Sequence, residues 1–215
     1  MKIERDEIIG IICSVDEETI GTFTSRFKNE MEQFVDVIVE SLNQFDVISL
    51  NYNGEERMAT ILLYLFNGIR LLINAFHLLF MGYLIAAGNL MRQSMESINM
   101  AILMSIPQSE YVKFKRKGTD YKVNYASARI TAMLDDTRIS REAWDNWIEI
   151  ETQYNLSSHP TAFALSECYD FHKHSLAIEP LYDVDKEIAY LKEIDRMINV
   201  AQNLGNIFQG ILPNK

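Results

Sequence analysis

The sequence predicts an all-α fold: a single-domain helical bundle built around a central antiparallel helix hairpin. Three observations support this prediction. Only 9 glycines and 4 prolines occur among 215 residues, too few for the many turns of an all-β chain. Apolar residues make up 48% of the chain, enough for one sizeable core. Apolar side chains also recur every three or four positions over long stretches, which is the period of a helix facing a core.

The first long helix is predicted over about 17–46, after an N-terminal segment, 1–15, that is expected to be amphipathic or a loose arm. Acidic residues at Asp16, Glu17 and Glu18 suit a helix start because the helix dipole favours negative charge there. The Asn-Tyr-Asn-Gly sequence after this helix is typical of a turn.

Two apolar helices are predicted next, over 55–80 and from Gly82 to about 105. Gly82 marks the end of the first, and Pro107 stops the second because proline cannot continue a helix interior. Long apolar helices joined by a tight turn form an antiparallel hairpin. We therefore expect this hairpin at the centre of the fold.

Residues 71–88 are also long and apolar enough to cross a bilayer. Asn74 and His77 interrupt the stretch, so it is interpreted as the core helix of a soluble protein with no membrane span. The two cysteines, Cys13 and Cys168, lack the spacing of a zinc site or a disulfide framework. A cytoplasmic location without a metal or cofactor is predicted, since the cytosol is reducing.

The composition changes over 107–124, which is predicted to be a basic loop that separates no second core. Beyond it, helices are predicted over 125–134, 140–154, 162–172 and 183–211. The last of these has an expected core stripe at Ile188, Leu191, Ile194, Ile198, Ala201, Leu204 and Ile207.

The first candidate site combines two groups of residues. Arg92 and Glu96 stand one turn apart on an apolar helix, so they can pair. They either lock the core as a structural ion pair or form a polar pocket in which Arg92 holds an anion and Glu96 orients a partner. Downstream, Tyr154, Ser158 and His159 could complete such a pocket, with His159 exchanging protons or serving only as a structural hydrogen-bonding group.

Two further candidates concern phosphate chemistry. Arg70 and His77 are seven residues apart and so lie on one face of their helix, with a spacing typical of HEPN-type ribonucleases. The basic loop interleaves aromatic residues with cations that can meet nucleic acid or form a solvated surface. These cations are Lys113, Lys115, Arg116, Lys117 and Lys122. The net charge of −10 disfavours broad binding of RNA or DNA.

One pattern resembles a known family. The run G-x5-G-N-L-M-R-x3-E-S-I, followed further along by Y-x3-S-H-P, is similar to a broad set of bacterial all-helical proteins often grouped as HEPN-like. The resemblance covers about 55–160. It implies an all-α bundle in which Arg92, Glu96, Tyr154, Ser158 and His159 converge, a role in phage defence or a toxin–antitoxin system, and dimer formation.

Two functions follow as hypotheses. The first is a helical interaction or regulatory module that binds a protein partner or a second copy of the chain. The alternative is a metal-independent ribonuclease or nucleotide-handling effector. In it, His77 or His159 carries the proton, and Arg70 or Arg92 stabilises the developing phosphate charge.

Overall fold

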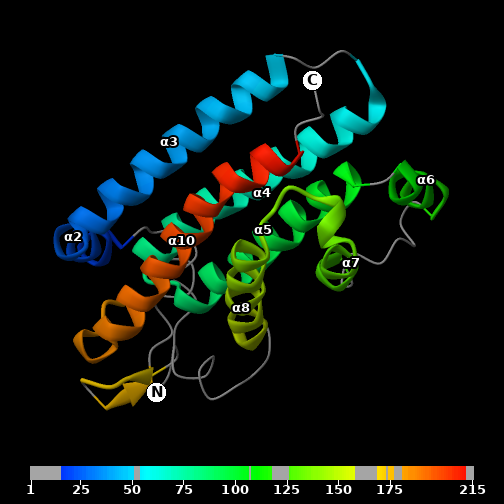
Figure 1. Cartoon of the computed structure of the whole chain (residues 1–215). Helices are drawn as coiled ribbons and strands as arrows, with labels where there is room; N and C mark the ends of the chain where they lie inside the picture. Colours follow the sequence, from blue (N-terminus) through cyan, green and yellow to red (C-terminus); the bar gives the residue numbers. More distant parts are fainter. Residues whose placement is uncertain are drawn as a thin grey trace, which may run out of the picture.

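The computed structural model describes residues 16–50, 54–106, 108–117, 126–157, 169–172, 174–176 and 181–211. Its helices are α2 (Glu17–Arg26), α3 (Lys28–Leu50), α4 (Glu56–Phe80), α5 (Leu84–Ser105), α6 (Gln108–Lys117), α7 (Ala126–Ala132), α8 (Arg141–Ser157) and α10 (Glu187–Ile211). Two 3-10 turns, Leu134–Asp136 and Val184–Lys186, precede α8 and α10. Strands β1 (Tyr169–Asp170) and β2 (Ser175–Leu176) pair antiparallel. The predicted all-α bundle is confirmed (Figure 1).

Helices α4 and α5 form the predicted central antiparallel hairpin. Gly82 makes the turn between them with a φ of 87°, a conformation that glycine adopts without strain. The two helices run in opposite directions: the Ser97 hydroxyl donates to the Tyr64 carbonyl, and the Ser94 hydroxyl donates to the Gly68 carbonyl. At Gly68 the helices are so close that an added Cβ would lie 2.5 Å from the side chain of Ile98.

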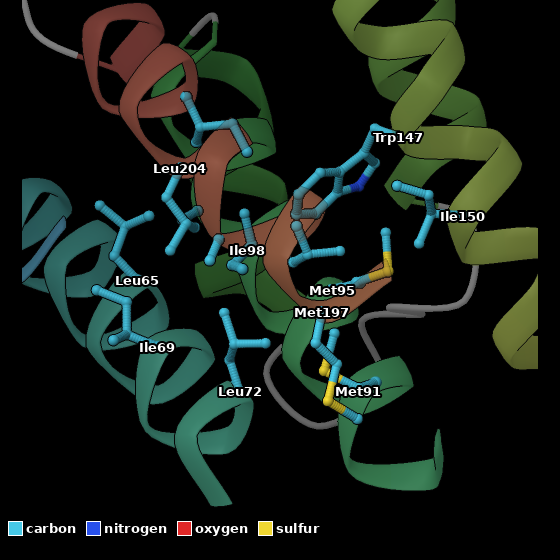
Figure 2. Packing of buried hydrophobic residues seen from close by; sticks show 14 of the residues in the cluster. Leu65, Ile69, Leu72, Met91, Met95, Ile98, Trp147, Ile150, Met197 and Leu204 are labelled. Atoms are coloured by element: carbon cyan, nitrogen blue, oxygen red, sulfur yellow. The ribbon is translucent and has the colours of Figure 1, made fainter. Parts of the chain in front are cut away.

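The hydrophobic core lies where α8 and α10 cover this hairpin. Figure 2 shows Leu65 of α4, Met95 of α5, Trp147 of α8 and Leu204 of α10 meeting there. Helix α10 also packs along α3, which lies beside it in Figure 1. The core thus joins elements from both halves of the described chain.

Helix α4 is the one element of the described residues long and apolar enough to cross a membrane. Only 39% of its most apolar stretch is buried, yet it forms half of the central hairpin. This position agrees with its interpretation as a core helix.

Several sequence predictions were wrong in detail. The helix expected over 17–46 is divided at Phe27, which leaves helical geometry with φ −114° and ψ 36°. Phe27 is buried in an aromatic cluster with Phe23, Tyr182 and Tyr190. Phe23 and Phe27, four residues apart, both enter that cluster.

The predicted basic loop was wrong over 108–117, which forms helix α6. Tyr111 and Phe114, three residues apart on one helix face, pack inward, and Phe114 makes an edge-to-face contact with Tyr64 of α4. The remaining loop residues, 118–124, lie outside the described residues. A helix gives this segment an apolar face that a loop would lack.

The C-terminal region differs from the prediction at two points. Within the helix predicted over 162–172, Tyr169–Asp170 is a strand, and 162–168 lie outside the described residues. The predicted core residue Ile188 is 70% exposed, because α10 turns Tyr190 rather than Ile188 into the aromatic cluster.

Candidate functional site

A polar cavity of about 320 Å³ lies between α5, α7 and α8. Its lining residues are Arg92, Glu96 and Asn99 from α5, Ala126, Ser127, Ala128 and Thr131 from α7, and Ile148, Glu151, Thr152 and Asn155 from α8. The volume is at the lower end of the range for small-molecule sites. The predicted pair, Arg92 and Glu96, is therefore part of a cavity wall.

Arg92 and Glu96 pair across one helical turn, with Arg92 Nε 3.0 Å from Glu96 Oε1. Their side chains are 30% and 27% exposed, so the pair is solvated on its cavity side. A pair this accessible contributes little to stability, since water screens its attraction. The position fits a polar pocket better than a dry structural lock.

Glu151 is the third charged residue of the cavity, and the sequence analysis did not identify it. Its Oε1 accepts hydrogen bonds from Ser127 Oγ and Asn99 Nδ2, both at 3.1 Å. Burial raises the pKa of Glu151, and the negative charge of Glu96 adds to that effect. The two hydrogen bonds and the charge of Arg92 act in the opposite direction.

A buried tryptophan fixes the orientation of these groups. Trp147 Nε1 donates to Asn99 Oδ1 at 2.8 Å. The indole nitrogen can only donate, so the Asn99 oxygen must face Trp147 and its NH₂ group must face Glu151. Asn99 is itself 1% exposed, so it has no other arrangement that satisfies its polar atoms.

A sequence signal for Glu151 was present but weak. Ile148, Glu151, Thr152 and Asn155 follow the three-and-four spacing of one helix face. This stripe runs beside the buried stripe that contains Trp147 and Tyr154. The spacing alone does not show that α5 and α7 pack against the stripe that contains Glu151.

The structure does not bring Tyr154 to Arg92 and Glu96. Its side chain is 1% exposed and faces α10, where Glu193 and Arg196 form an ion pair of 3.1 Å. Among the described residues, neither the Tyr154 hydroxyl nor Glu193 Oε1 makes a hydrogen bond of good geometry. Burial, followed by the charge of Glu193, raises the pKa of Tyr154 well above its ordinary value. The predicted partners Ser158 and His159 lie outside the described residues.

Arg70 and His77 share the exposed face of α4, as the spacing predicted. Arg70 Nη2 donates to Asn67 Oδ1 at 3.0 Å. Exposed apolar residues of the same helix, Leu63 and Phe66, lie close by in sequence. Neither Arg70 nor His77 lines the polar cavity.

The basic residues of α6 are partly neutralised. Lys113 Nζ is 2.5 Å from Glu110 Oε1, and Lys115 Nζ is 2.6 Å from Glu56 Oε2. Arg116 and Lys117 are exposed, and Lys122 lies outside the described residues. These pairs weaken α6 as a site for phosphate groups.

Among the residues that the structure describes, no group of three or more histidine, cysteine, aspartate or glutamate side chains could hold a metal ion. Comparison of the chain with protein-family models, with curated proteins and with solved structures found no match.

Proposed function

We propose that the protein is a helical interaction or regulatory module that binds a second copy of itself or another protein through α3 and α4. The observation that carries this proposal is the distribution of exposed apolar side chains. Leu63 of α4 is 71% exposed, and most of the other large apolar residues exposed in the described chain lie on the same two helices. These are Val35, Val39, Val47, Leu50, Phe66 and Ile73.

Helices α3 and α4 contact each other, so these exposed side chains lie on two neighbouring helices. Phe34 of α3 stacks on Phe76 of α4 with ring centroids 3.9 Å apart, and Phe45 approaches Phe66 at 5.7 Å. Apolar patches of this kind mark interaction sites, because leaving them in water costs free energy that a partner recovers.

The resemblance to HEPN-like proteins supports a cytoplasmic role in phage defence or a toxin–antitoxin system, and it supports a dimer. The exposed faces of α3 and α4 suit such an assembly. The polar cavity lies on other helices, α5, α7 and α8, and stays accessible in this arrangement.

Sedimentation equilibrium tests this proposal. We expect the wild-type chain to self-associate and Leu63→Glu to weaken association at least tenfold, because a carboxylate in an apolar interface is costly. Ile188→Glu is the matched control, since Ile188 is equally exposed, at 70%, but lies on α10. A wild-type chain that remains monomeric, or equal effects of the two variants, would contradict self-association through α3 and α4.

A metal-independent ribonuclease or nucleotide-handling effector is the second candidate. It is favoured by the position of Arg70 and His77 on one exposed face of α4. In this reaction His77 moves the proton, and Arg70 stabilises the charge that develops on phosphate.

Incubation of the protein with total RNA and tRNA in the presence of a chelator tests this alternative. It predicts fragments that His77→Ala abolishes while the fold is retained. The exposed His172 provides a matched control, since His172→Ala should leave cleavage unchanged. Intact RNA, or full wild-type cleavage by both the His77→Ala and the His159→Ala variants, excludes this activity for the two histidines.

A further inference from the structure

The polar cavity has an excess of negative charge. Its charged lining residues are Glu96, Glu151 and Arg92. Arg92 Nε pairs with Glu96, whereas Glu151 makes no ion pair with any described residue. A ligand that carries positive charge would neutralise the excess negative charge of the lining residues.

Glu151 is held ready to accept a cation. Ser127 and Asn99 both donate to its Oε1, and its Oε2 receives no hydrogen bond from the described residues. The Trp147–Asn99 hydrogen bond keeps the Asn99 amide in place behind it. A binding group whose orientation is fixed before the ligand arrives loses little entropy on binding.

The energetics of Glu151 also favour a cation. Burial and the charge of Glu96 both raise the pKa of Glu151, so its ionised form is disfavoured when the cavity holds only water. A cation close to both carboxylates would remove that penalty. An anion would increase it.

The size and lining of the cavity exclude a bare metal ion as the best occupant. About 320 Å³ is much more than one ion requires. Hard cations such as Ca²⁺ need six or more oxygen ligands, and the described residues contain no group of three or more histidine, cysteine, aspartate or glutamate side chains that could hold a metal ion. Ala126, Ala128 and Ile148 give the cavity an apolar side that suits a carbon chain.

We propose that the cavity between α5, α7 and α8 binds a small organic cation whose ammonium or guanidinium group lies between the carboxylates of Glu96 and Glu151. N–H donors of such a group match the two carboxylates, and charge-assisted hydrogen bonds are stronger than neutral ones. The carbon chain of the ligand packs on the apolar side of the cavity. This inference does not depend on association through α3 and α4.

Both tryptophans of the chain report on this cavity. Trp147 donates to Asn99, and Trp144 Nε1 donates to Thr131 Oγ1 at 2.8 Å. Asn99 and Thr131 line the cavity, and the chain contains 2 tryptophans in all. Tryptophan emission therefore reports occupancy through the hydrogen bonds to these two lining residues.

The probes are n-butylamine and n-butylguanidine, with n-butanol as the neutral match of the same chain length. We expect a saturable change in tryptophan emission with either cation and none with n-butanol. Glu151→Gln should weaken the binding at least about tenfold, since it removes the unpaired charge. Glu149→Gln, an exposed glutamate on the same helix outside the cavity, should bind as the wild type does.

Circular dichroism confirms that each variant folds, and Glu96→Gln replaces Glu151→Gln if the latter does not. The inference is overturned if neither cation gives a saturable signal, or if n-butanol gives the same signal. It is also overturned if the charge-removing variant binds unchanged, or if magnesium chloride or sodium phosphate binds in place of the amines.

Discussion

The two faces of α8 pack against two different groups of glutamate and arginine, one that includes the α5 pair Arg92–Glu96 and one that is the α10 pair Glu193–Arg196. On one face, Glu151 opens on a cavity and accepts two hydrogen bonds, while Arg92 and Glu96 stand at the rim, partly exposed. On the other face, Tyr154 packs against the pair of Glu193 and Arg196 on α10. Both glutamates have raised pKa values for the same main reason, which is burial.

The two groups differ in the source of positive charge that is available to each glutamate. The Glu193 side chain is 5% exposed, so its charge depends on Arg196 and on the core around it. Glu151 faces a space in which a ligand can supply the missing charge. The comparison teaches that a perturbed carboxylate indicates a site only when a cavity accompanies it.

The largest expected effect is in the closed group. Arg196→Ala should lower the free energy of unfolding by about 3 kcal/mol, because it leaves the buried Glu193 without its counter-charge. Urea denaturation followed by circular dichroism measures the loss. Lys192→Ala, at an exposed position of the same helix, is the control and should change little.

The pH dependence of that loss sharpens the comparison. Burial raises the pKa of Glu193, and without Arg196 the pKa should rise further. Protonation of Glu193 removes its uncompensated charge. The loss in free energy of unfolding caused by Arg196→Ala should therefore shrink as the pH falls from about 8 to about 5. A deficit that is independent of pH would mean that Arg196 acts through packing.

Glu151→Gln should have the opposite sign. Glutamine keeps the shape and an oxygen that can accept from Ser127 and Asn99, but it removes a buried charge and its repulsion with Glu96. We expect a gain on the order of 1 kcal/mol near pH 7, together with loss of cation binding. Residues that serve a ligand often reduce stability in this way.

The gain should depend on pH. Because the folded-state pKa of Glu151 is raised, the folded protein takes up a proton more readily than the unfolded chain. The contribution of Glu151 to the free energy of unfolding of the wild type therefore becomes more favourable as the pH falls. The extra stability of Glu151→Gln over the wild type should vanish in acid. Urea midpoints at about pH 7.5 and 5.5 measure it. A loss of stability in Glu151→Gln at neutral pH would make Glu151 a structural residue like Glu193.

The sequence predicted the fold because the fold depends on local features. The apolar period, Gly82 and Pro107 determine the central hairpin, and each acts within a few residues of its own position. The break at Phe27 was missed because no glycine or proline marks it, and its contacts with Tyr182 and Tyr190 join residues distant in sequence. Helix α6 was missed because its charges concealed the inward pair of Tyr111 and Phe114.

The candidate site was predicted only in part, for the same reason. Arg92 and Glu96 were identified because an ion pair within one turn is a local pattern. Glu151 accepts hydrogen bonds from Asn99 and Ser127, which come from two other helices. Residue spacing along the chain does not predict that these three helices pack together. Tyr154 was grouped with Arg92 and Glu96 through the Tyr-x3-Ser-His-Pro pattern, which does not show that Tyr154 lies on a different face of α8 from the cavity and is directed toward Glu193.

The smallest expected effect tests this reassignment of Tyr154. Tyr154→Phe removes a buried hydroxyl that faces Glu193 without a hydrogen bond of good geometry, so stability should change by less than about 1 kcal/mol. The hydroxyl faces Glu193 rather than the cavity, so the affinity for n-butylamine should equal that of the wild type. Urea denaturation and the tryptophan titration measure the two quantities on one sample. A clear loss of cation affinity in a folded Tyr154→Phe variant would connect the two faces of α8, because the hydroxyl could then reach the cavity only through a shift of that helix.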